Sequence, residues 1–206
     1  IIINKSVTIK AKNTTGEATK CTLVSNVVFT QGIFFKNIGS SYSDIIIDGI
    51  EIKGVADTNK TIFFENGDDK SNVTIRNCII NGESESGREA INGNRVLGGH
   101  FTIQNCVFKD YVDHWFFFDN TSSSGTTQAH LVSFTFDSNY VTNCSGSIAI
   151  RGLDSSGNRM QRAEITNNVM KYTNVHSKFW AAIEINSCNK VVIKNNIIKG
   201  ITKSIS

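Results

Sequence analysis

Apolar and polar residues alternate along this chain in short segments, and the alternation recurs at a nearly constant spacing. Six twelve-residue segments align without gaps, and they begin at residues 43, 71, 99, 132, 161 and 189. Alternation with a period of two predicts β-strands that bury one face. Self-similarity at a period of about 28 residues predicts a solenoid in which each repeat forms one coil.

Three positions of the repeat are consistently apolar: the third, the fifth and the tenth. The fifth is occupied by Ile47, Ile75, Ile103, Phe136, Ile165 and Ile193. We expect positions three and five to form the inward face of one strand, and position ten to lie on a second strand beyond a turn. A third strand is predicted by apolar runs at residues 62–66, 90–94, 116–120, 147–152 and 182–186.

Three strands in each repeat, with no helical periodicity, predict an all-β chain. The architecture that accommodates them is a single-stranded right-handed parallel β-helix of three parallel sheets, with about seven rungs of about 28 residues. We expect one β-helix domain over residues 1–206. Because the chain opens with Ile1 rather than Met, we also expect a piece of a longer polypeptide that lacks its end caps.

Positions seven and eight of the repeat form the predicted turn. They read Asn77-Cys78, Asn105-Cys106, Asn167-Asn168 and Asn195-Asn196 in four of the copies. Asn tolerates a left-handed backbone, and stacked amides hydrogen-bond from rung to rung, so this pattern predicts a structural Asn ladder. Cys78 and Cys106 share position eight, and we expect them to be small buried side chains rather than a disulfide or reactive thiols.

Composition excludes several classes of partner. The formal net charge is +3 and the Lys and Arg residues are scattered, which argues against a nucleic-acid partner. No apolar run is long enough to predict a membrane span. The five cysteines show neither CxxC nor Cys/His spacing, so a zinc site is not expected.

The third strand carries an unusual outward row of side chains. If Phe64, Phe118, Ile150 and Ile185 point inward, the outward residues of successive rungs are Phe63 and Glu65; Ile91 and Gly93; Trp115, Phe117 and Asp119; Ala149 and Arg151; and Trp180, Ala182, Glu184 and Asn186. Sugar rings pack their C–H faces on aromatic planes, while charged side chains bond hydroxyl and uronate groups. We therefore predict a glycan-binding site formed by Trp115, Phe117, Trp180, Glu184, Asn186 and Glu65. The alternative is an apolar strip that a loop or another subunit covers.

Arg151, His114 and Asp119 are the candidate catalytic residues. Arg151 ends a strand beside a turn, and its alternative role is an ion pair with Asp119 of the preceding rung. His114 is either a general base or a packed surface residue. Glu65, Asp119 and Glu184 offer the oxygen ligands that calcium prefers, provided that loops bring two of them together. No metal ligand or cofactor is assigned, and calcium stays an alternative.

The stacked rungs resemble the pectate-lyase-like right-handed parallel β-helix superfamily over nearly the whole chain. Residues 143–152 (NCSGSIAIRG) and 164–168 (EITNN) resemble a segment of the alginate lyase and chondroitinase B family of polysaccharide lyases. In that family the strand carries a catalytic arginine, so the resemblance implies that Arg151 protonates the leaving group. The family's catalytic Lys has no counterpart in residues 116–120 (FFFDN), and its calcium cluster is not evident.

The resemblance implies a secreted, periplasmic or cell-surface bacterial protein that acts on an acidic, uronate-containing polysaccharide. The implied activity is that of a polysaccharide lyase or a glycoside hydrolase. The residues leave open a non-catalytic alternative, in which the protein is a carbohydrate-binding or structural module such as an adhesin.

Overall fold

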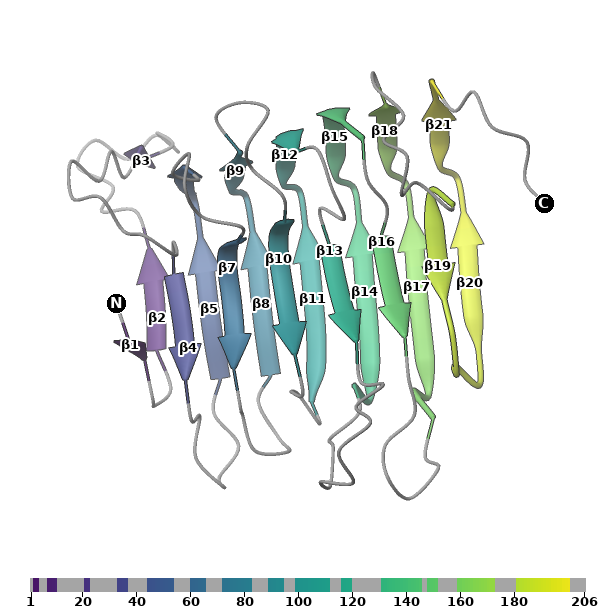
Figure 1. The fold of residues 1–206 in the computed structure, drawn as a ribbon, viewed down its shortest axis with the longest axis horizontal. Coiled ribbons are helices and arrows are strands. Elements are labelled where there is room, and N and C mark those ends of the chain that lie inside the picture. Colours follow the sequence, from purple (N-terminus) through teal and green to yellow (C-terminus); the bar gives the residue numbers. More distant parts are fainter. Residues whose placement is uncertain are drawn as a thin grey trace.

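The computed structural model describes the strands of the chain and many of the turns between them. The described residues are 2–3, 7–10, 21–22, 33–36, 44–53, 60–65, 72–82, 89–94, 99–111, 116–119, 131–145, 148–151, 159–172 and 181–200. They form three parallel sheets, each with seven strands in this part of the chain (Figure 1). The described part of the chain contains no helix that is long and apolar enough to cross a membrane.

Each sheet takes one strand from each coil. Sheet A consists of β1 (Ile2–Ile3), β4 (Ile33–Lys36), β7 (Lys60–Glu65), β10 (Glu89–Asn94), β13 (Phe116–Asp119), β16 (Ile148–Arg151) and β19 (Ile183–Ile185). Sheet B consists of β2 (Val7–Lys10), β5 (Asp44–Asp48), β8 (Asn72–Arg76), β11 (His100–Gln104), β14 (Ser133–Asp137), β17 (Arg162–Thr166) and β20 (Val191–Lys194). Sheet C consists of β3 (Cys21–Thr22), β6 (Ile50–Lys53), β9 (Ile79–Asn81), β12 (Val107–Tyr111), β15 (Tyr140–Cys144), β18 (Val169–Tyr172) and β21 (Ile197–Lys199).

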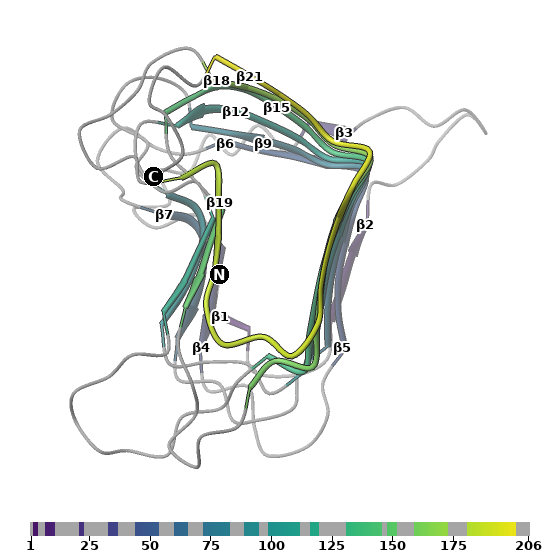
Figure 2. The same cartoon turned by 90° about the vertical axis from the view of Figure 1, so that its right-hand side faces the viewer.

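The chain winds through sheets B, C and A in turn and then returns to sheet B one rung further along the axis. Figure 2 looks along this axis with the C-terminal end toward the viewer. The chain turns anticlockwise in this view as it advances toward the viewer, so the coil is right-handed. The predicted right-handed parallel β-helix of three sheets and seven rungs is confirmed.

The register stacks equal positions of the repeat. Phe101, which lies on β11 at position three of the repeat, has Val73 and Phe134 as its Cα partners. The later residues of β11 pair with their equivalents in the same register. Rings from different sheets meet inside the coil. Phe64 of sheet A lies edge-on to Phe101 of sheet B at 5.6 Å between centroids, and Phe108 of sheet C lies 5.8 Å from Phe136 of sheet B. The predicted inward positions therefore form one continuous core.

Position seven of the repeat makes the corner between sheets B and C. Its φ is positive in six successive rungs: 73° at Gly49, 55° at Asn77, 53° at Asn105, 56° at Ser138, 57° at Asn167 and 57° at Asn195. These values lie in the left-handed region, which Gly and Asn enter more readily than other residues. The predicted turn is confirmed at this position.

Position eight follows the turn and points into the core. Asn139 and Asn168 are buried there. Asn168 Oδ1 accepts the backbone N–H of Asn139 at 2.8 Å, and Asn168 Nδ2 donates to the carbonyl of Phe136 at 2.8 Å. Asn196 repeats both bonds one rung later, with the N–H of Asn168 and the carbonyl of Ile165. The predicted Asn ladder is confirmed, and it satisfies polar backbone groups that the sharp corner leaves inside.

The cysteines at position eight are free and buried. Cys78 Sγ and Cys106 Sγ each lie 3.6 Å from the carbonyl of the residue at position five of the preceding rung, Ile47 and Ile75. The neighbouring thiol of Cys78, together with burial, raises the pKa of Cys106. Burial also raises the pKa of Cys144, to about 12. The expectation of small buried side chains is confirmed for Cys78 and Cys106.

Candidate functional site

The C-terminal ends of the strands of sheet A carry most of the charged residues that the sequence analysis singles out. Cα partners run along it in the order Lys36, Glu65, Asn94, Asp119 and Arg151. Asn186 extends this line, because it follows Ile185, which is the Cα partner of Ile150. We call this line, from Glu65 to Asn186, the strand-end row.

A second line runs parallel to the strand-end row, two residues earlier in each strand. It contains Phe34, Phe63, Asn92, Phe117, Ala149 and Glu184, which are Cα partners in succession. We call it the middle row. The register thus brings six of the nine predicted site residues onto two adjacent lines: Glu65, Asp119, Arg151 and Asn186 on the first, and Phe117 and Glu184 on the second.

The structure corrects the prediction of which residues of β10 point out of the coil. Ile91 and Gly93 were expected to point outward, but Ile91 is the Cα partner of Ile62 and Phe116 and is fully buried in the core. Asn92 therefore takes the outward place. The sequence misled here because the segment alternates weakly, and Gly93 has no side chain to mark a face.

The middle row is covered at two of its positions. Ala149 lies on the outer side of β16 and is fully buried, and Asn92 is 2% exposed. Glu184 is half-buried and Asn186 is exposed. The described face is therefore more accessible at its strand-end side near β19, where Asn186 is exposed, than at Ala149.

Asn92 is a polar group whose hydrogen bonds are incomplete. Its Nδ2 donates to Glu89 Oε2 at 2.6 Å, but its buried Oδ1 has no hydrogen-bond partner among the residues that the structure describes. A buried acceptor without a partner is destabilising by roughly 1–3 kcal/mol, so such a position favours a donor from a water molecule or a ligand hydroxyl. Sequence reasoning missed Asn92, although an Asn between Ile91 and Gly93 within the strand was the available signal.

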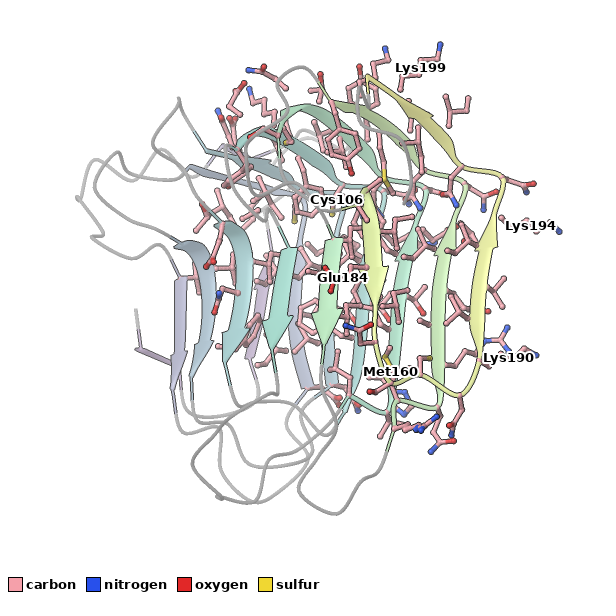
Figure 3. All side chains as sticks on the ribbon, turned by 45° about the vertical axis from the view of Figure 1, so that its right-hand side comes forward. Cys106, Met160, Glu184, Lys190, Lys194 and Lys199 are labelled. Carbon is pink, nitrogen blue, oxygen red and sulfur yellow. The ribbon has the colours of Figure 1, made fainter. Side chains whose placement is uncertain are left out.

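Glu184 and Asn186 form the described end of the candidate site. Asn186 Nδ2 donates to Glu184 Oε1 at 3.3 Å, and the backbone N–H of Asn186 donates to the carbonyl of Ile150 at 2.8 Å. Figure 3 shows Glu184 on β19, at the side of the last complete coil. The pair presents a carboxylate and an amide within reach of the end of β16, where Arg151 lies.

Several predicted residues fall outside what the structure describes. His114, Trp115 and Trp180 lie outside the described residues, and only the backbone is described for Glu65, Phe117, Asp119 and Arg151. Within the described side chains, no group of three or more His, Cys, Asp or Glu residues is placed to hold a metal ion. Calcium binding through Glu65, Asp119 and Glu184 stays a prediction, because two of these carboxylates are not among those side chains.

The outer face of sheet B is an alternative surface, but its polar groups bond to one another. His100 Nδ1 lies 2.7 Å from Ser133 Oγ, and the N–H of His100 donates to Asn72 Oδ1 at 3.2 Å. Arg76 and Asp48 form an ion pair at 2.9 Å between neighbouring rungs. These contacts link rung to rung, so we assign this face a structural role.

Compared with models of protein families, with curated proteins and with solved structures, the chain matches none of them.

Proposed function

We propose that this protein is a glycan-active β-helix that binds an extended, acidic polysaccharide along the strand-end row of sheet A. The observation that carries the proposal is the register, which puts Asp119, Arg151 and Asn186 on consecutive rungs of one row. With rungs about 4.8 Å apart, the row from Glu65 to Asn186 covers about 19 Å. A regular row of charged and amide groups of this length suits a polymer better than a compact small molecule.

Arg151 is the group best suited to an acidic sugar. A guanidinium binds a carboxylate through two parallel hydrogen bonds, and it stays charged at any physiological pH. Asn186 and Glu184 lie on the next rung and offer hydrogen bonds to sugar hydroxyls. Trp115 and Trp180 are the proposed stacking platforms, as the sequence predicts.

The catalytic form of this proposal is β-elimination of a uronate polymer. A base, His114 or Asp119, removes the proton on C5 of the uronate, and the bond from C4 to the leaving oxygen then breaks. Arg151 stabilises the charge that develops on the carboxylate and protonates the leaving oxygen. The product carries a double bond between C4 and C5. By this proposal the protein works outside the cytoplasm or at the cell surface of a bacterium.

A non-catalytic binding module is the second candidate. Its support is also the register: Asp119 is the Cα partner of Arg151, and opposite charges at such positions pair readily. A paired guanidinium still binds carboxylates, but it is a poor proton donor. Residues 116–120 contain no Lys that would take over the role of acid.

Ultraviolet absorbance of the unsaturated product separates the two candidates. Uronate polymers are incubated with the unmodified protein, with Arg151→Ala, and with Arg162→Ala as a matched control. Arg162 lies on sheet B and pairs with Glu164, away from the strand-end row. A lyase gives product that Arg151→Ala lowers by roughly 100-fold or more and Arg162→Ala leaves unchanged.

Binding without turnover is read from a glycan array. Binding that Arg151→Ala and a Trp115→Ala, Trp180→Ala double variant both weaken, with no ultraviolet product, supports the binding module. Absence of both binding and product on every uronate polymer tested contradicts the proposal in either form.

A further inference from the structure

Sheet C brings lysines that are scattered along the sequence into one row, at position eleven of the repeat. Figure 2 shows its strands β12, β15 and β18 side by side along one wall of the coil. Phe108 and Met170 at position ten are fully buried, so position eleven faces outward. Lys171 is exposed, and Lys199 points away from the coil (Figure 3). We call these Cα partners the lysine row: Lys53, Asn81, Lys109, Thr142, Lys171 and Lys199.

Lysines occupy every second rung of this row from β6 to β18. The lysines on β6, β12 and β18 alternate with uncharged residues on β9 and β15, which are Asn81 and Thr142. Rungs lie about 4.8 Å apart, so the lysine positions recur at intervals of about 9.6 Å. Only the backbone is described for Lys53, whereas Lys109 is half-buried. A row of cations at a constant interval suits a polymer better than a single small anion.

The positive charge of the lysine row is not neutralised by the residues that the structure describes. Lys109, Lys171 and Lys199 form no ion pair among them. The outer face of sheet B differs, because Arg76 there pairs with Asp48 of the neighbouring rung at 2.9 Å. Charges on sheet B link one rung to the next, whereas these lysines of sheet C do not. The lysine row is therefore available to anions from outside the chain.

A second outward row of sheet C, at position nine, lies beside the lysine row. Lys171 Nζ lies 5.2 Å from the centroid of the Tyr140 ring in this second row, and the cation–π contact holds the ammonium group over the face. Tyr140 and its neighbours Val107 and Val169 are half-buried, in contrast to the fully buried Ala149 on the outer side of sheet A. The row is apolar or aromatic after its first member: Glu51, Ile79, Val107, Tyr140, Val169 and Ile197.

An acidic linear polysaccharide matches these two rows. Its sugar rings present apolar C–H faces, and carboxylate or sulfate groups at the ring edges bind ammonium groups. Successive sugars of an extended chain advance by about one rung spacing, so a charge on every second sugar recurs at nearly the interval of the lysines. A nucleic acid fits less well, because double-stranded DNA carries one charge per about 1.7 Å of its axis.

We propose that the outer face of sheet C binds an acidic polysaccharide that carries a carboxylate or sulfate group on alternate sugars. Lys109 and Lys171 each bind one anionic group, two rungs apart. Val107, Tyr140 and Val169 pack against the sugar rings beside them. This surface lies on a different sheet from the strand-end row, and the inference does not rest on the function proposed for sheet A.

The first probe is a labelled hyaluronan oligosaccharide, because hyaluronan alternates a uronate with a neutral sugar. It is titrated by fluorescence anisotropy into Arg151→Ala, in which the strand-end row has lost its guanidinium. We expect saturable binding that weakens as salt rises, because salt screens exposed charges. A chondroitin 4-sulfate oligosaccharide of the same length compares sulfate with carboxylate. Tighter binding of that second probe makes sulfate the preferred group and supports the proposal equally.

Double variants in the Arg151→Ala background locate the surface. Lys109→Gln with Lys171→Gln should weaken hyaluronan binding at least about tenfold, because both ion contacts are lost. Lys109→Arg with Lys171→Arg keeps both charges and should retain binding. The matched control is Lys190→Gln with Lys194→Gln, which removes the same net charge beside and on β20 of sheet B and should leave binding unchanged. None of these four lysines belongs to the buried core, so the variants should fold.

Four outcomes overturn the proposal. The first is no binding of either glycan, and the second is an equal loss in the two glutamine variants, which indicates attraction by net charge alone. The third is tighter binding of a single-stranded oligonucleotide of equal charge, which makes a nucleic acid the ligand. The fourth is glycan binding by the unmodified protein that Arg151→Ala abolishes and the Lys109→Gln, Lys171→Gln variant retains. That result places the glycan on sheet A and supports the proposed function while it contradicts this inference.

Discussion

At the scale of single residues, position eight of the repeat shows how two chemically different side chains serve one purpose. Asn139 and Cys106 both direct a donor at the carbonyl of position five in the preceding rung, at 3.1 Å and 3.6 Å. The amide also accepts a backbone N–H of the preceding rung, as Asn139 does for Cys106 at 2.8 Å. A thiol is a weaker donor than an amide, so the Asn rungs have the stronger turn.

Asn168→Asp tests the ladder at its most buried point. The carboxylate keeps the shape of the side chain but loses the Nδ2 donor, which leaves the carbonyl of Phe136 facing a buried negative charge. We expect a loss of about 3 kcal/mol in the free energy of unfolding. The control is Asn195→Asp at the exposed position seven, where Asp also tolerates the left-handed backbone, with a change within about 0.5 kcal/mol. Denaturant titration measures the free energy of unfolding of both variants. Equal losses in the two would contradict the role of Asn168 in the buried ladder.

Asp137 makes the stability of the fold depend on pH. Burial raises the pKa of its carboxyl group, but hydrogen bonds from Thr166, Asn167, Ser138 and Gln104 outweigh burial, so the net pKa is lowered. A lowered pKa in the folded state stabilises the protein above the ordinary value of about 3.9, and this contribution is lost as the pH falls through the folded-state pKa.

We therefore expect Asp137→Asn to flatten the decrease in unfolding free energy on acidification below about pH 4. Thr166→Val removes the shortest of the four bonds, 2.6 Å to Oδ1, and should raise the pKa of Asp137 toward its ordinary value. Carboxyl-carbon NMR titration measures that pKa. An unchanged titration in Thr166→Val would show that the Thr166 bond does not determine it.

At the scale of elements, the ends of the sheet C strands depend on close backbone approach. A Cβ on Gly82 would lie 2.1 Å from the carbonyl oxygen of Asp110 on the next rung. Gly200 meets Tyr172 in the same way and has φ of +83°. Because the obstructing atoms are backbone, a side chain there forces two rungs apart.

Gly82→Ala should lower the free energy of unfolding by about 2–4 kcal/mol through this clash. The matched control is Gly49→Asn. Gly49 has φ of 73°, and other rungs carry Asn at the same position, so this substitution should be neutral or slightly stabilising. Thermal unfolding of the two variants measures the contrast, and a tolerated Gly82→Ala would mean that the rungs are not packed as described.

At the scale of the whole molecule, each rung contacts only its neighbours, so burial at a given position depends on where the rung lies in the stack. Position five shows this most clearly. Ile165 is fully buried between two rungs, whereas Ile193 at the same position is 54% exposed and, in the part of the chain that the structure describes, pairs with a strand on one side.

Ile165→Ala should therefore lower the free energy of unfolding by about 3–4 kcal/mol, and Ile193→Ala by about 1 kcal/mol. The two substitutions are chemically identical, so the difference between the two losses of unfolding free energy measures only the effect of the position of the rung in the stack. Equal losses in chemical denaturation would show that the C-terminal end is covered in solution.

The sequence predicted the coil but not the state of its outer face. The repeat positions, the left-handed turn at Asn77 and its equivalents, and the ladder of buried Asn residues all follow from patterns within one coil. The inward and outward residues of β10 were predicted wrongly, because Gly93 and the small residues around it leave the alternation ambiguous. Covering of Ala149 was an alternative that the sequence alone does not decide.

The sequence by itself determined the β-helix, since the alternation within each strand and the turn residues are local and are repeated often enough to fix the register. Only the tertiary structure decided which outward residues are accessible. Ala149 is fully buried, and the buried Oδ1 of Asn92 has no hydrogen-bond partner among the described residues, and the alternation in the sequence marks neither. The open core at Val191 and Ile193 depends on the absence of a covering rung in the described part of the chain. The physical reason is that alternation sets the direction of a side chain, whereas accessibility is set by what packs against it.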